Sequence, residues 1–130
     1  MQRVHLIGGV AGVAAFVLSG QMLRLHHPAM RAMDDGPRMM LISRHIYVLG
    51  GGLVNLALGL YLRSEGEGWR KHLQMAGSVL VAVALLPLVM AFLAAPEHVV
   101  EGRSWWTAYG WFALFGGMML HLLARMSSGN

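Results

Sequence analysis

Histidine is the residue type in this sequence that is best suited to binding chemistry. Seven histidines stand in a chain of 130 residues that is 56% hydrophobic and only 12% charged. They are His5, His26, His27, His45, His72, His98 and His121. Imidazole nitrogens bind haem iron and copper, so the question is which histidines the folded chain can bring to a common site.

Helical phase separates the histidines into two kinds. Positions seven apart lie nearly in line on a helix that turns by about 100° per residue. Three histidines align with small residues in this way: His5 with Gly12 and Ser19, His45 with Gly52 and Gly59, and His121 with Gly117, Gly110 and Thr107. Small residues mark close helix contacts in membranes, so we expect these three histidines to face the bundle interior. His72 is in phase with Val79 and Val83, and we expect it at the headgroups.

Two inward histidines near the same end of a four-helix bundle can ligate one haem from opposite sides. His5 and His121 form such a pair. His45 is a further haem-ligand candidate, and three histidines are available near its end of the bundle: His26, His27 and His98. Neighbouring glycines would let a porphyrin approach the backbone. The alternative is the commoner, structural role, in which histidines near span ends cap carbonyl groups or join helices by hydrogen bonds. The cofactor is left unknown, with haem b as one hypothesis.

Methionine is the second unusual feature, with eleven residues in the chain. Thioether and imidazole groups together suit Cu(I). Met30 and Met33 follow His26 and His27 closely, so this segment is a candidate copper site. No Met-x-x-Met or His-x-His motif is repeated, however, and methionine is also an ordinary apolar filler of helices. Copper handling is therefore a third hypothesis.

The segment around Arg44, His45 and Tyr47 combines a charge, an imidazole and a phenol at the start of an apolar block. These three residues could hold the headgroup of a lipid or a quinone. The alternative is an interfacial anchor, in which Tyr47 belongs to the aromatic belt of the membrane.

Several function classes are disfavoured by what the sequence lacks. There is no cysteine, which excludes disulfides, thiolate metal sites and a cysteine nucleophile. No Asp or Glu falls within the apolar blocks, although proton-coupled transporters usually place a carboxylate there. No hydrolase triad, phosphate-binding glycine loop or metalloprotease helix motif is found. We therefore predict no catalytic residues, and an enzymatic function is disfavoured.

Four apolar blocks must position these residues. We predict spans over residues 4–26, 38–62, 72–95 and 104–125, each near the ~20 residues that cross ~30 Å of hydrocarbon. The predicted fold class is all-α: an integral membrane, antiparallel four-helix transmembrane bundle that forms one domain over residues 1–130. Lysines and arginines divide five to five between the two sides, so the positive-inside rule leaves the orientation open.

The net charge of +4 comes from basic residues scattered over short segments rather than gathered on one face. Anionic lipid headgroups are thus the expected partner, and nucleic acid is not. The favoured function is a non-enzymatic accessory or binding component, which packs against itself as a homo-oligomer or against a larger membrane complex. The alternatives are a haem-b electron carrier and copper handling. We expect a multi-pass protein of a bacterial-type inner membrane.

Four spans require Met1 and Asn130 to lie on the same side of the membrane. Fusions of alkaline phosphatase and of a fluorescent protein to each end test this, because the first is active outside the cytoplasm and the second fluoresces inside it. We expect both ends to report the same compartment. Opposite compartments would mean an odd number of spans.

Overall fold

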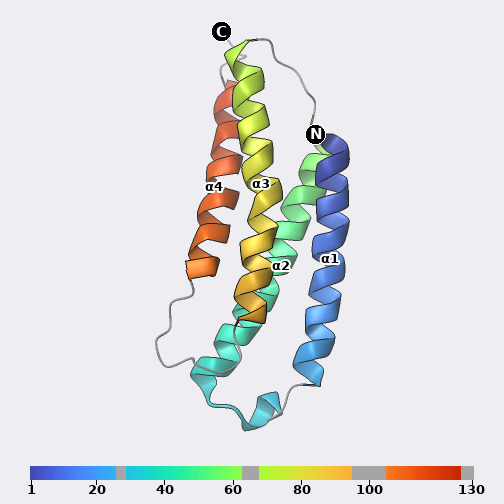
Figure 1. Ribbon diagram of the computed structural model, residues 1–130, viewed down its shortest axis with the longest axis vertical. Helices are drawn as coiled ribbons and strands as arrows, with labels where there is room; N and C mark the ends of the chain where they lie inside the picture. Colours follow the sequence, from blue (N-terminus) through green and yellow to red (C-terminus); the bar gives the residue numbers. More distant parts are fainter. Residues whose placement is uncertain (26–28, 63–67, 95–104, 127–130) are drawn as a thin grey trace.

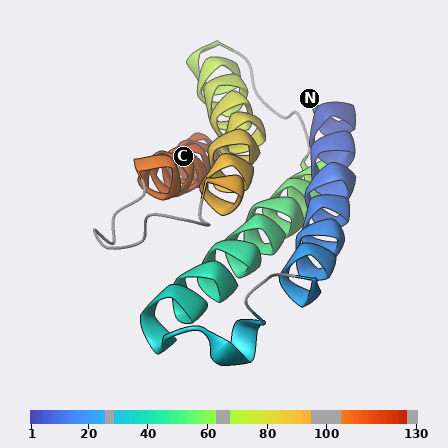
Figure 2. The same cartoon turned by 60° about the horizontal axis from the view of Figure 1, so that its bottom comes forward.

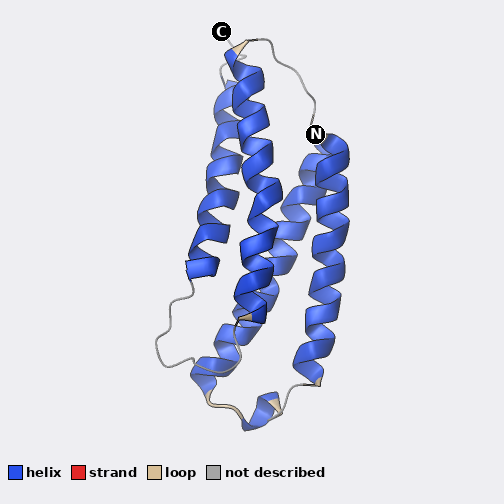
Figure 3. Cartoon of the chain, viewed as in Figure 1, coloured by secondary structure: helices blue, strands red, loops and turns tan. Residues whose placement is uncertain are grey.

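The described part of the chain is almost entirely helical. The computed structural model describes residues 1–25, 29–62, 68–94 and 105–126. Four long helices are present: α1 (Gln2–Arg24), α2 (Asp35–Tyr61), α3 (Trp69–Leu93) and α4 (Trp105–Met126), with a short 3₁₀ helix, η1 (Met30–Ala32), before α2 (Figure 1). The described residues contain no strand (Figure 3). The all-α prediction is confirmed, and each predicted span falls on one helix.

All four helices are long and apolar enough to cross a membrane. The shortest, α4, has 22 residues, which corresponds to about 33 Å at ~1.5 Å per residue. Large apolar side chains on the outside of the bundle, such as Ile7, Leu86 and Phe112, are exposed. An outer surface of this kind suits hydrocarbon better than water.

The helices associate as two pairs. Helix α1 packs along α2, and α3 packs along α4, while contacts between α2 and α3 join the pairs (Figures 1 and 2). Among the described residues, α4 makes no extensive contact with α1 or α2. The interior is therefore tightly filled within each pair and more open between α2 and α4.

Glycines set the close approach within the α1/α2 pair. A Cβ atom on Gly12 would lie 2.7 Å from the Cα atom of Gly52, and one on Gly59 would lie 2.7 Å from the Cγ atom of Leu6. Only a residue without a side chain fits at such a distance, as at other close contacts of membrane helices. These glycines lie on the small-residue stripes that were predicted to mark close helix contacts, and the neighbouring helix occupies the space beside them.

The α3/α4 pair is built in the same way. A Cβ atom on Gly77 would lie 2.7 Å from the carbonyl oxygen of Gly117. Beside this contact, Val81, Ala84 and Leu114 form a buried apolar cluster. Close backbone contact and apolar packing therefore hold α3 and α4 together over the same stretch.

Alanine at Gly12 tests the importance of this contact. In Gly12→Ala the new methyl group meets the backbone of Gly52, and overpacking of this kind costs about 1 to 3 kcal/mol. The matched control is Gly50→Ala, whose Cβ atom would meet nothing within 4 Å. The control should be neutral, or more stable by about 0.5 to 1 kcal/mol, because alanine is the better helix former. The free energy of unfolding in detergent is the measurement, and equal values for the two variants would contradict the close contact.

Candidate functional site

The most buried polar contact of the bundle joins His5 on α1 to Asn55 on α2. Both residues are 0% exposed, and the Nδ1 atom of His5 lies 2.9 Å from the Oδ1 atom of Asn55. The Asn55 amide nitrogen donates to the carbonyl oxygens of Gly51 at 3.0 Å and Val81 at 3.1 Å. These two bonds fix the orientation of the amide, so its oxygen faces His5 as an acceptor. His5 must therefore donate from Nδ1.

The second ring nitrogen of His5 is left without a partner. A neutral imidazole that carries its proton on Nδ1 presents a lone pair on Nε2. This Nε2 atom is buried and has no hydrogen-bond partner among the described residues. A buried polar atom left unpaired costs about 1 to 3 kcal/mol. The same arrangement, with one nitrogen donating to an oxygen and the other free, is what a metal-binding histidine requires.

His121 on α4 lies on the other side of the same interior region. Its ring is half-buried, and its Nε2 atom is 3.3 Å from the Oγ atom of Ser78 on α3, which is itself 1% exposed. Polar side chains from all four helices thus gather at this end of the bundle, which we call the His5 end. The predicted inward orientation of both histidines is confirmed.

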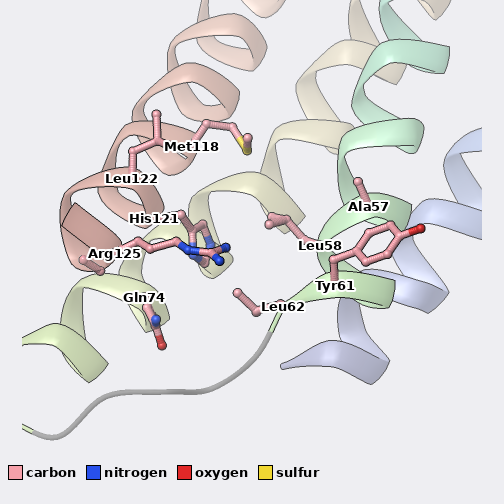
Figure 4. A pocket seen from close by; sticks show the side chains of 10 residues that line it. Ala57, Leu58, Tyr61, Leu62, Gln74, Met118, His121, Leu122 and Arg125 are labelled. Carbon is pink, nitrogen blue, oxygen red and sulfur yellow. The ribbon is translucent and has the colours of Figure 1, made fainter. Parts of the chain in front are cut away.

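A cavity of about 680 Å³ opens beside His121, where α4 and α2 are not in extensive contact. Its lining comes from α2, α3 and α4: Ala57, Leu58, Tyr61, Leu62, Gln74, Met118, His121, Leu122, Ala124 and Arg125. Figure 4 shows His121 and Arg125 on one side, with Leu58 of α2 and Leu62, the residue that follows α2, on the other. The volume lies within the range of about 300 to 1,000 Å³ that is usual for ligand pockets, and apolar walls with few polar groups are also typical.

His45 has a different environment at the opposite end of α2. Its Nδ1 atom lies 2.8 Å from the Oγ atom of Ser19 on α1, and that hydroxyl donates to the carbonyl oxygen of Phe16. The imidazole also stacks on the Phe16 ring, with centroids 4.1 Å apart. These contacts join α1 to α2. The predicted haem partners of His45, namely His26, His27 and His98, lie outside the described residues, so this second site stays a prediction.

The other predicted residues of the headgroup site contact different helices. Arg44 is buried and donates to the carbonyl oxygen of Ala91 in the last turn of α3, where a cation interacts favourably with the helix dipole. Tyr47 packs edge-on against Trp111 of α4, with ring centroids 5.2 Å apart. The structure thus gives Arg44, His45 and Tyr47 separate partners. Their proposed binding of a lipid or quinone headgroup stays a prediction.

The candidate copper residues are only partly within the described chain. Met30 begins η1 and Met33 follows its end, whereas His26 and His27 lie outside the described residues. Within the described ranges, no group of three or more His, Cys, Asp or Glu residues could hold a metal ion. The copper hypothesis is not tested by these contacts.

Two residues of the cavity, Gln74 and Arg125, were given no role from the sequence. Asn55 and Ser78 had a recognisable signal, since a polar side chain deep in an apolar span needs a partner from a neighbouring helix. Gln74 and Arg125 lie near span ends, where polar residues are ordinary, and only the cavity distinguishes them.

No protein-family model, curated protein or solved structure matches this chain.

Replacing Asn55 tests the hydrogen-bond network at the His5 end. Asn55→Leu keeps a similar volume but leaves the buried His5 Nδ1–H group without an acceptor, which should lower the free energy of unfolding by about 1 to 3 kcal/mol. Ser43→Ala is the control in the same helix, because the Ser43 hydroxyl bonds only within α2, to the carbonyl oxygen of Met39. It should change stability by less than about 0.5 kcal/mol. Thermal unfolding in detergent compares them, and an unaffected Asn55→Leu protein would deny the network any energetic role.

Proposed function

We propose that this chain is a small, non-enzymatic membrane protein that binds an amphipathic molecule in the cavity between α2 and α4. The single observation that carries the proposal is the cavity itself, whose apolar walls end in a few polar side chains at the His5 end. Apolar walls with converging polar groups are the usual construction of a small-molecule site.

The membrane location is part of this proposal. Four helices of sufficient length and apolarity support it. The antiparallel arrangement is supported by glycine contacts that run in opposite chain directions, since Leu6 meets Gly59 and Gly12 meets Gly52. An even number of spans would then place both termini on one side. The bacterial-type inner membrane and the packing against a second copy or a larger complex remain expectations from the sequence.

The chemistry of the lining suggests the class of ligand. Leu58, Met118 and Leu122 provide apolar surface, and Gln74, His121 and Arg125 provide hydrogen-bond donors. The ligand we expect has an apolar body and a polar edge that accepts hydrogen bonds from these side chains.

Filling the cavity tests the proposal. Ala57→Trp adds a large side chain to the cavity wall, while Ala14→Trp adds the same side chain to an exposed position on α1 that does not line the cavity. Native mass spectrometry of the detergent-purified chain should detect a retained non-protein mass in the wild type and in Ala14→Trp. We expect its occupancy to fall severalfold in Ala57→Trp, because the tryptophan occupies the space of the ligand.

Two results would count against a binding function. One is a wild-type protein that retains no additional mass, and the other is equal retention by the two tryptophan variants. Either would favour an accessory role based on helix packing alone.

A further inference from the structure

We infer that the ligand of the cavity is a neutral para-quinone with an apolar tail, whose two carbonyl oxygens accept hydrogen bonds at two levels of the cavity wall. This inference rests on the proposed binding function and names the ligand class of that same site. The site is a different place from the group of Arg44, His45 and Tyr47, for which a quinone headgroup was one prediction from the sequence. His121 lines the cavity and His5 does not, so the cavity does not offer one ligand to both histidines.

The inner level of the cavity wall is His121, and its contact with Ser78 decides which ring nitrogen is a donor. The Ser78 hydroxyl is 1% exposed, and its partner in the described chain is the Nε2 atom of His121, at 3.3 Å. A buried hydroxyl needs an acceptor, so Ser78 donates to Nε2 and the imidazole carries its proton on Nδ1. Since Nε2 is occupied, the nitrogen left for a ligand is a hydrogen-bond donor. An oxygen acceptor is the group that fits it.

Helices α3 and α4 run in opposite directions along this wall. A Cβ atom on Gly77 would meet the carbonyl oxygen of Gly117, whereas one on Gly110 would meet the side chain of Leu88. Contacts thus move toward the end of α3 as they move toward the start of α4. A step back along α3 and a step forward along α4 therefore lead toward the same end of the bundle.

The outer level of the cavity wall consists of Gln74 and Arg125. Gln74 stands four residues before Ser78, and Arg125 stands four residues after His121. Both are therefore about one turn, or about 6 Å at ~1.5 Å per residue, nearer to the end of the bundle. Both also line the cavity (Figure 4). The amide and the guanidinium group each provide N–H donors at this level.

Two donor levels about one turn apart distinguish a quinone from other apolar molecules. A para-quinone carries its carbonyl oxygens on opposite sides of one flat ring, so the ring can lie along the wall with one oxygen at each level. A fatty acid carries both oxygens on a single carbon atom, which serves only one level. No Asp or Glu is among the described residues that line the cavity, so the lining does not require a donor from the ligand.

The apolar part of the cavity continues to the outer surface of the bundle. Ala57 on α2 and Leu122 on α4 line the cavity and are exposed. The two helices make no extensive contact with each other. The tail of a quinone can therefore pass between them into the hydrocarbon without displacing a helix contact, while Leu58 and Met118 cover the ring.

Direct binding of a tritiated quinone to the detergent-purified full chain tests the inference. The probe is trimethyl-decyl-para-benzoquinone, which is fully substituted and so does not react with amines. The matched competitor is decyl-trimethylbenzene, which keeps the ring and the tail but has no oxygen. One equivalent of the quinone should bind at least about tenfold more tightly than the oxygen-free analogue, which is about 1.4 kcal/mol. Equal affinities would overturn the inference, because the donors would then contribute nothing.

One variant at each level tests the two hydrogen bonds separately. Gln74→Leu and His121→Phe should each weaken quinone binding by roughly three- to tenfold, the effect of one lost hydrogen bond, and leave the affinity of the oxygen-free analogue unchanged. The control is His72→Phe, because His72 is exposed and does not line the cavity. If only one of the two variants weakens binding, the ligand accepts at a single level and is not a quinone.

Two further measurements guard against a folding defect in His121→Phe, since this change also removes the partner of Ser78. Circular dichroism and a single elution peak in detergent establish the fold of each variant before binding is measured. Gln74→Leu keeps the test decisive if His121→Phe fails to fold, because Gln74 is only partly buried. Unchanged quinone binding in Gln74→Leu would then contradict the inference.

Tritiated decanoic acid and Ala57→Trp separate this inference from the proposed function. If decanoic acid binds in the wild type but not in Ala57→Trp, and the quinone does not bind in a saturable way, the cavity binds an acidic molecule and the quinone is wrong. If neither probe binds in a saturable way and native mass spectrometry finds no retained mass, both the inference and the binding function fail.

Discussion

A polar group in a hydrocarbon environment must find its hydrogen bonds inside the protein, and Asn55 meets this constraint by joining three helices. Its amide donates to the carbonyl oxygens of Gly51 on its own helix and of Val81 on α3, and its oxygen accepts from His5 on α1. The rotation of α1, α2 and α3 about their axes is tied to these bonds. The protonation of His5 depends on them as well, because the fixed amide oxygen selects the Nδ1–H tautomer and leaves Nε2 free.

The glycine contacts explain why a cavity exists beside this network. Backbone approach at Gly12 and Gly52 draws α1 onto α2, and the same holds for Gly77 and Gly117 in α3 and α4. Helices drawn together in pairs cannot all be equally close to one another. The space is left where α4 makes no extensive contact with α2, and His121 lines it. Packing within the pairs and space between them are thus two results of the same glycine pattern.

The sequence predicts the helices and the direction of some side chains, because both depend on the spacing of apolar and small residues along the chain. The four helices follow from the length of the apolar blocks, and the burial of His5 and the exposure of His72 follow from helical phase. The partners of each side chain do not follow, because phase gives the direction of a residue but not the helix that it meets. Arg44 illustrates the difference: it was grouped with His45 and Tyr47 by proximity in sequence, yet it bonds to the end of α3. The cavity could not be predicted from the sequence either, because its position depends on which helices pair.

Buried polar side chains at both ends of the bundle find partners on neighbouring helices, and two buried atoms of the described residues do not. At the end opposite His5, the Nδ1 atom of His45 meets the Ser19 hydroxyl and Arg44 meets a helix carbonyl. The Thr107 hydroxyl is buried without a partner in the described chain, but it lies in the first turn of α4, close to residues that are not described. The Nε2 atom of His5, on the first helix, is likewise buried without a partner in the described chain. An unpaired lone pair in that position lowers the stability of the bundle by about 1 to 3 kcal/mol. A ligand that brought a hydrogen-bond donor to this atom would recover that free energy, so ligand binding and bundle stability should rise together.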